Sequence, residues 1–151
     1  MVKFNSVDEI LVFAIREEEK AAAFYQALAG RVKRPGLRRG LEEFAEEELG
    51  HKAKLEKVRR EGTLAMSGKA VLDLKIGEYL VAPDPSPDMD YQEVLIVAMK
   101  KEKEAFRMYT DLAGVTEDAG IRAVFLSLAQ EEARHKLRFE VEYDEHFLTE
   151  N

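Results

Sequence analysis

Six ionisable residues occupy positions at which amphipathic helices should carry apolar core residues. They are four glutamates and two histidines: Glu18, Glu48, His51, Glu102, Glu132 and His135. Glu18, for example, interrupts an apolar stripe at 3–4 spacing that includes Ala14 and Tyr25. A lone carboxylate is very costly to bury in a medium of low dielectric constant. Two divalent cations would cancel the four negative charges, so the pattern predicts bound metal.

The ligand types and their spacing predict a dinuclear site. Glu48 and His51 are three residues apart, as are Glu132 and His135, so on a helix each pair lies on one face, one turn apart. Each Glu-x-x-His pair is close enough to share a metal with one of the two lone core glutamates. Carboxylate oxygens and imidazole nitrogens suit iron, manganese or zinc rather than metals that prefer sulfur.

The sequence also repeats itself without a gap at an offset of 84 residues. Between residues 8–56 and 92–140, 17 of 49 positions are identical, which is far more than chance would give. Glu18 aligns with Glu102, and the two Glu-x-x-His pairs align with each other. We therefore expect two similar helical hairpins that each supply half of the site.

A lone Glu from each of two helices and a Glu-x-x-His from each of the other two is the pattern of ferritin-like di-iron carboxylate bundles. Within that superfamily, the sequence resembles rubrerythrin and its relatives without a rubredoxin domain, because Tyr25 and Tyr109 each follow a lone Glu by seven residues. The resemblance covers nearly the whole chain except residues 62–90. It implies an all-α, ferritin-like four-helix bundle.

The resemblance also implies a role for each site residue. The lone glutamates, Glu18 and Glu102, would be terminal ligands. Glu48 and Glu132 would bridge two metal ions, expected to be iron, with manganese or zinc as alternatives. His51 and His135 would bind one metal each. Tyr25 and Tyr109 would be either core aromatics or hydrogen-bond donors to ligand carboxylates. Glu47 and Glu131 also repeat, but the residue before a core position points about 100° away on a helix, so we interpret them as surface or helix-edge charges.

Two features distinguish the chain from full-length rubrerythrin. It contains no cysteine, so the four-Cys rubredoxin module is absent and any reductant must come from outside. At the two positions one turn after a lone Glu, where rubrerythrin carries an additional Glu on one helix, it has Ala21 and Ala105. These small residues would leave space for a small oxidant.

Helix-start signals place the ligands in the middle of helices. Ser6 with Glu9, and Asp90 with Glu93, form capping-box patterns. We predict one domain over residues 1–151, with hairpins at about 6–62 and 90–148 and a long crossover at about 62–90. The crossover length fits the ferritin-like topology and would also permit a domain-swapped homodimer.

Charge and hydropathy exclude several classes of partner. The net charge of −7 disfavours nucleic acid. The longest apolar run, Val94 to Met99, is too short to span a membrane, and the first residues lead into a helix rather than a signal peptide. We therefore expect a cytoplasmic protein.

Three functions remain open at this stage. The first is a di-iron oxidoreductase that reduces hydrogen peroxide or O2 with an external electron donor such as a rubredoxin. The second is bacterioferritin-like oxidation and storage of Fe(II). The third is a non-catalytic bundle that a metal only stabilises.

Overall fold

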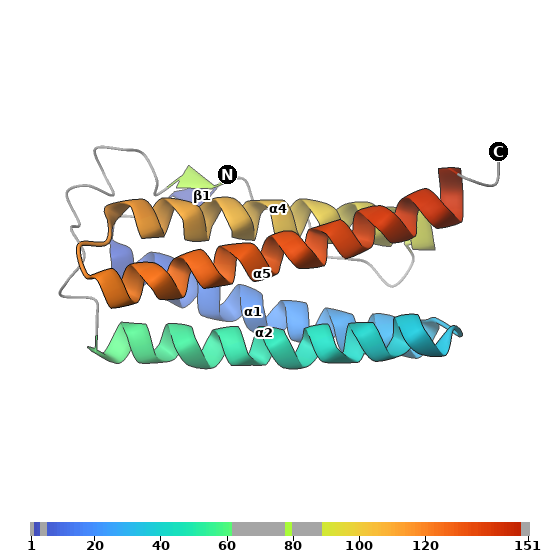
Figure 1. The fold of residues 1–151 in the computed structure, drawn as a ribbon, viewed down its shortest axis with the longest axis horizontal. Coiled ribbons are helices and arrows are strands. Elements are labelled where there is room, and N and C mark those ends of the chain that lie inside the picture. Colours follow the sequence, from blue (N-terminus) through green and yellow to red (C-terminus); the bar gives the residue numbers. More distant parts are fainter. Residues whose placement is uncertain (1, 4–5, 62–77, 80–88, 149–151) are drawn as a thin grey trace.

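The computed structural model describes residues 2–3, 6–61, 78–79 and 89–148. Within these residues, four long helices lie side by side along one axis (Figure 1). They are α1 (Val7–Arg31), α2 (Pro35–Glu61), α4 (Tyr91–Val115) and α5 (Ala119–Tyr143). A π-helical turn, Asp144–Leu148, extends α5. The predicted four-helix bundle is confirmed.

Side-chain caps fix the start of three of these helices. The Ser6 hydroxyl accepts a hydrogen bond from the Glu9 amide at 3.1 Å, and the Asp90 carboxylate accepts one from the Glu93 amide at 2.8 Å. Asp118 caps α5 in the same way. Each cap satisfies an amide that has no partner inside the helix, so the sequence sets the register in which the ligand positions face inward.

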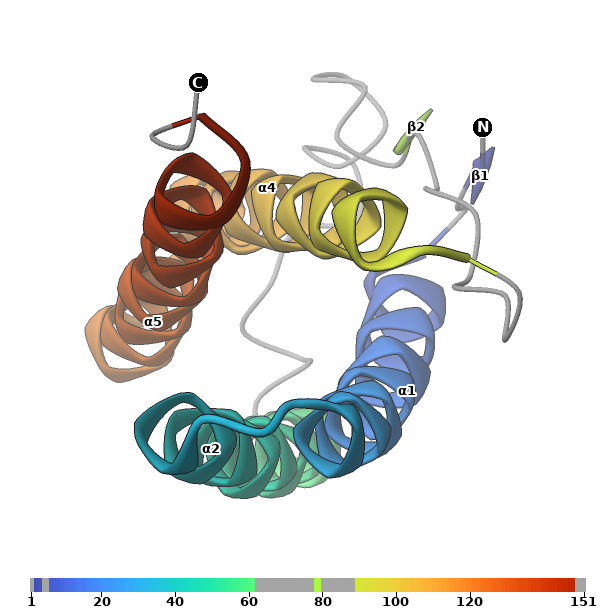
Figure 2. The same cartoon turned by 90° about the vertical axis from the view of Figure 1, so that its right-hand side faces the viewer.

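The helices form two antiparallel hairpins, α1–α2 and α4–α5, whose tight connections lie at opposite ends of the bundle (Figure 1). In the end-on view the order around the axis is α1, α2, α5, α4 (Figure 2). The end of α2 and the start of α4 also lie at opposite ends. The predicted crossover lies in the sequence between these two helix ends, and its residues 62–77 and 80–88 are outside the described part of the chain.

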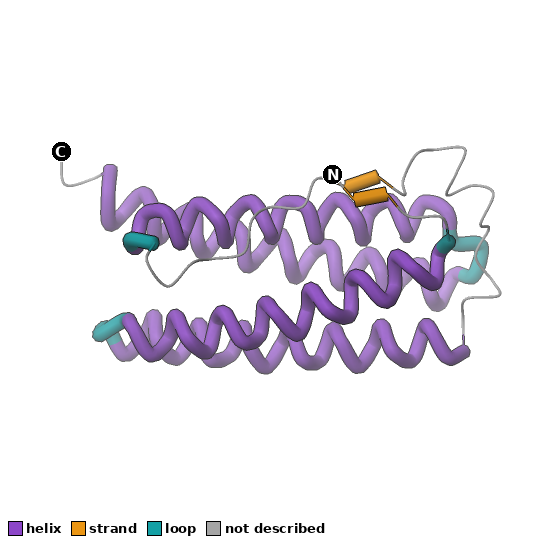
Figure 3. Tube along the Cα trace, turned by 180° about the vertical axis from the view of Figure 1, so that it is seen from behind, coloured by secondary structure: helices purple, strands orange, loops and turns teal. Residues whose placement is uncertain are grey.

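One small element departs from the all-α prediction. Val2–Lys3 (β1) pairs antiparallel with Glu78–Tyr79 (β2), with Val2 opposite Tyr79 and Lys3 opposite Glu78. The pair lies beside the bundle and not within it (Figure 3). It joins the first residues of the chain to the connection between the hairpins.

Two apolar clusters fill the bundle on either side of its middle. One contains Ile10, Leu55, Leu112 and Phe125 from one half of the bundle. The other contains Leu28, Leu41, Leu95 and Phe139 from the other half. Full burial of a side chain of this kind contributes about 1.5–3 kcal/mol. The two clusters hold the helices together and leave the polar residues as a separate layer between them.

None of the described helices combines the length and the apolar character that a membrane crossing requires.

Candidate metal centre

The six predicted ligands lie in that middle layer, and every one is buried. None of the six is more than 3% exposed. One glutamate comes from each of α1 and α4, and a Glu-x-x-His pair comes from each of α2 and α5. Each helix therefore contributes its ionisable groups at mid-length, as the repeated sequence predicts.

The ligand atoms gather into two overlapping groups. In each group, one ligand atom from each residue lies within 4.8 Å of the others. The first group is Glu18, Glu48, His51 and Glu132, and the second is Glu48, Glu102, Glu132 and His135. Glu48 and Glu132 belong to both groups, whereas each histidine and each lone glutamate belongs to one.

Six buried polar atoms in this layer have no hydrogen-bond partner among the described residues. They are Glu18 Oε2, Glu48 Oε1, His51 Nδ1, Glu102 Oε2, Glu132 Oε1 and His135 Nδ1. Buried polar atoms are nearly always paired, because an unpaired one loses its hydration without replacement. These six atoms include one from each predicted ligand residue, and the six residues gather in the same layer of the bundle. A pair of divalent cations fits this set of donors.

Both histidine rings turn Nδ1 toward the carboxylates. His51 Nδ1 lies 2.7 Å from Glu132 Oε1 and 3.5 Å from Glu18 Oε2, without the alignment of a hydrogen bond. His135 Nδ1 lies 3.0 Å from Glu48 Oε1. Once deprotonated, imidazole nitrogens that face several carboxylate oxygens at these distances would form a nitrogen and oxygen ligand set of the kind iron, manganese and zinc accept.

Without a cation, the cluster holds protons in place of metal charge. Burial, followed by repulsion from Glu132, raises the pKa values of Glu18, Glu48 and Glu102. Burial opposes ionisation of Glu132 too, but contacts with Glu102 and His51 lower its pKa to about 2. Burial lowers the pKa of His51, and the surrounding carboxylates outweigh it and raise that pKa to about 10.

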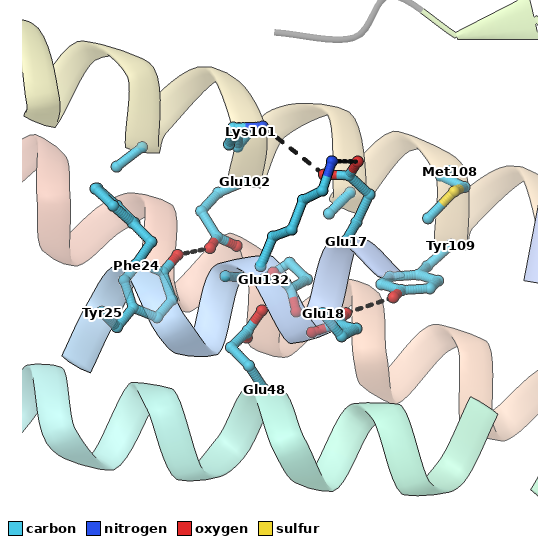
Figure 4. Close-up of a pocket in the computed structure, with 14 residues that line it drawn as sticks. Glu17, Glu18, Phe24, Tyr25, Glu48, Lys101, Glu102, Met108, Tyr109 and Glu132 are labelled. Atoms are coloured by element: carbon cyan, nitrogen blue, oxygen red, sulfur yellow. Dashed lines mark hydrogen bonds and ion pairs between the residues drawn. The ribbon is translucent and has the colours of Figure 1, made fainter. Parts of the chain in front are cut away.

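The two predicted tyrosines are buried and donate to ligand carboxylates. The Tyr25 hydroxyl donates to Glu102 Oε1, and the Tyr109 hydroxyl donates to Glu18 Oε1. Each bond crosses from one hairpin to the other, although each tyrosine lies on the same helix as the other lone glutamate (Figure 4). The hydrogen-bonding alternative is therefore the one observed. Burial and the Glu18 charge raise the pKa of Tyr109.

Glu47 and Glu131 do more than the sequence interpretation allowed. They lie at helix edges as predicted, with side chains 34% exposed. However, His51 Nε2 donates to Glu131, and His135 Nε2 donates to Glu47 at 2.6 Å. These bonds fix the tautomer that leaves Nδ1 free for a metal. The sequence interpretation considered only the direction of each glutamate on its own helix. It missed these bonds because each partner histidine comes from the other hairpin. The repetition of the two glutamates at the 84-residue offset was the available signal.

A cavity of about 60 Å³ adjoins the cluster between α1 and α4 (Figure 4). Glu18, Glu48, Glu102 and Glu132 line its inner part. Apolar side chains, including Ala21, Ala105, Phe24 and Met108, line its walls. Because one ordered water needs roughly 10–15 Å³, the cavity has room for about four to six water-sized atoms. The predicted space beside Ala21 and Ala105 is therefore present.

Comparisons with known proteins agree with the fold. The family model described as Rubrerythrin matches residues 9–143. No curated protein sequence matches the chain. Solved structures with a similar fold include a candidate ferritin-like diiron-carboxylate protein from Thermotoga maritima, with a TM-score of 0.76 and 21% identity over 96% of this chain and 98% of that chain. Another is a hypothetical protein from Pyrococcus furiosus, with a TM-score of 0.69 and 25% identity over 92% and 89% of the two chains. The family match spans most of the sequence, and the chain therefore belongs to the rubrerythrin family.

Proposed function

We propose that this protein is a cytoplasmic di-iron oxidoreductase that reduces hydrogen peroxide or O2 with electrons from an external donor. The observation that carries the proposal is the set of six converging, unpaired ligand atoms, one from each predicted ligand. Glu48 and Glu132 would help to hold both ions, because they belong to both ligand groups. Glu18 with His51, and Glu102 with His135, complete the two coordination sites.

When bound, a pair of iron ions would supply the two electrons that, with two protons, convert hydrogen peroxide to two waters without release of a radical. The residues of the chain would hold the ligands in position and exclude water. The tyrosine hydroxyls hold Glu18 and Glu102, and the apolar walls of the cavity limit the water beside the centre. The chain has no cysteine, which supports an external donor such as a rubredoxin. We propose a homodimer, and the predicted crossover would permit exchange of hairpins.

The first test is metal content per chain on freshly purified protein, followed by stopped-flow absorption after mixing the Fe(II)-loaded protein with peroxide or O2. We expect about two irons per chain and rapid oxidation that an added reductant reverses. Glu48→Ala removes a carboxylate shared by both ligand groups and should abolish turnover. Glu46→Ala, at an exposed position of the same helix, is the matched control and should retain turnover.

Other outcomes would identify the alternatives. Unchanged turnover in Glu48→Ala would rule out the proposed centre. Two metals that do not react with either oxidant would indicate a metal that only stabilises the bundle. A large multimer that accumulates many irons per chain would indicate storage.

A further inference from the structure

The carboxylates behind the two ligand histidines have different partners. His135 Nε2 donates to Glu47 Oε2 at 2.6 Å, and the Arg134 guanidinium donates to the same oxygen at 2.5 Å. His51 Nε2 donates to Glu131, which forms no other ion pair within the described part of the chain. Both glutamate side chains are 34% exposed, so solvent screens them alike. One carboxylate therefore serves a single histidine, whereas the other is shared with a cation.

The internal repeat shows that this difference departs from an otherwise matched arrangement. At the 84-residue offset, Glu47 is equivalent to Glu131 and the two histidines are equivalent, but Arg134 is equivalent to Gly50. A glycine has no side chain that could reach Glu131. Apart from its chain neighbours and its own helix backbone, no atom of the described residues lies within 4 Å of where a Gly50 Cβ would be. The position therefore has room for a longer side chain.

An aromatic ring supports Arg134 at this place. The guanidinium carbon lies 5.6 Å from the centre of the Phe44 ring, a distance at which an aromatic face attracts a cation. Phe44 also stacks on the His135 ring, with 4.0 Å between the ring centroids. At the position equivalent to Phe44, the other hairpin has Leu128. The cation and its aromatic support therefore occur together beside His135, and the equivalent positions of the repeat carry neither.

We propose that Arg134 makes the two metal positions unequal, so that the ion beside His51 binds more tightly than the ion beside His135. This inference rests on the metal centre of the proposed function and not on its reaction. A carboxylate behind a ligand histidine increases the basicity of the imidazole toward a metal. Arginine is always charged, and its bond to Glu47 Oε2 weakens that effect on the histidine. The guanidinium charge also disfavours a metal cation nearby.

The exposure of Arg134 limits the size of the effect. Its side chain is 54% exposed, so solvent screens its charge. We expect the two affinities to differ by about three- to tenfold, which is less than the roughly 10- to 100-fold loss on removing a supporting carboxylate altogether. A first equivalent of metal should therefore occupy mainly the position beside His51.

The test is a stepwise Co(II) titration of the metal-free protein. Visible absorption measures the two affinities, and the shifted proton NMR signals of the two ligand imidazole N–H groups show which position fills first. The signal lost in His51→Gln identifies that histidine. Arg134→Gln should tighten binding beside His135 by about three- to tenfold, because it removes the charge. Arg134→Lys keeps the charge and should behave like the unmodified protein. Arg138→Gln, at an exposed position one turn further along α5, makes the same change in net charge and should have no effect.

The reciprocal variant is Gly50→Arg, which places a cation where the repeat predicts contact with Glu131. It should weaken binding beside His51 by a similar factor, and combined with Arg134→Gln it should reverse the order in which the two positions fill. Damage to the fold would weaken binding in every variant, so tighter binding in Arg134→Gln cannot arise in that way. Thermal unfolding of Gly50→Arg measures any such damage directly.

Three results would overturn the proposal. They are equal filling of the two positions in the unmodified protein, unchanged or weaker binding beside His135 in Arg134→Gln, and an equal effect of Arg138→Gln. Turnover is not a readout, so a loaded but inactive protein still tests the inference. Failure to bind two Co(II) ions per chain would instead overturn the metal centre of the proposed function.

Discussion

Each histidine of the cluster is held from both sides of its ring. Nδ1 faces the buried carboxylates, and Nε2 donates to a carboxylate at the helix edge. The acceptors, Glu131 for His51 and Glu47 for His135, come from the opposite hairpin. A carboxylate behind an imidazole fixes its orientation and increases its basicity toward a metal. We therefore expect the two edge glutamates to act on metal affinity, although neither belongs to a ligand group.

This leads to a prediction for Glu131. Glu131→Ala should lower the affinity for one metal of the pair by about 10- to 100-fold, because the His51 ring loses its support. Glu131→Gln keeps a hydrogen-bond acceptor and should lose less. Titration of the metal-free protein with Co(II) measures both affinities. Glu43→Ala, at an exposed position of α2, serves as the control. Equal affinities in Glu131→Ala and Glu43→Ala would show that the bond does not support the histidine.

At the scale of the elements, each hairpin packs mainly within itself, α1 on α2 and α4 on α5. Among the described residues, polar bonds between the hairpins occur around the cluster and also at the end of the bundle that holds the α1–α2 connection. There Arg34, before α2, contacts Glu142 of α5, which is buried and also accepts from the Tyr91 hydroxyl at 2.9 Å. Burial and the Glu142 carboxylate raise the pKa of Tyr91. This contact ties the α1–α2 connection to the second hairpin.

Arg34→Ala should therefore lower the free energy of unfolding by about 1–2 kcal/mol, because it leaves the buried Glu142 carboxylate without its cation. The exposed half of the Arg34 side chain limits the effect through screening by solvent. Arg38→Ala breaks an ion pair with Glu42 in which both side chains are exposed, and should cost less than about 0.5 kcal/mol. Urea unfolding of the two variants measures the difference, and equal costs would contradict the prediction.

The helices and the burial of six ionisable residues at mid-helix could be predicted from the sequence because local signals encode them. Caps such as Ser6 and Asp90, and ionisable residues at core positions, are visible in short stretches of sequence. The crossed bonds of Tyr25 and Tyr109 and the roles of Glu47 and Glu131 depend on which helices become neighbours. Spacing along one helix cannot supply that information. The β1–β2 pair escaped prediction for the same reason, since it joins segments far apart in the chain.

For the whole molecule, the buried cluster makes stability depend on pH and on metal. Above pH 7, the relevant group is His51, whose pKa is raised from 6.5 to about 10. The raised pKa values of Glu18, Glu48 and Glu102 act in the same direction. The metal-free native state therefore binds more protons than the unfolded chain. Stability from these groups is present at low pH and is lost as the pH rises through the folded pKa values. The lowered pKa of His135 acts in the other direction only below about its ordinary value of 6.5.

We therefore expect the unfolding temperature of the metal-free protein to fall between pH 7 and pH 9. Metal ions replace the bound protons, so the gain in unfolding temperature on adding Co(II) should increase over the same range. At a free metal concentration 100 times the dissociation constant, binding contributes about 2.7 kcal/mol. Thermal unfolding with and without metal at three pH values checks this. A metal-free protein whose stability rises toward pH 9 would refute it.

The crossed tyrosine–carboxylate bonds also bear on ancestry. Glu18 and Tyr25 lie in one hairpin, yet each is bonded to the equivalent partner in the other hairpin, Tyr109 and Glu102. One hairpin carries both a tyrosine and a lone glutamate, but in this structure the two residues do not bond to each other. Two copies of the same hairpin can form two such bonds, each from the tyrosine of one copy to the glutamate of the other. An ancestral gene for a single self-pairing hairpin would thus already encode a whole centre. Duplication and fusion would then have added only the connecting segment, after which the two halves were free to diverge, as at Glu17 and Lys101.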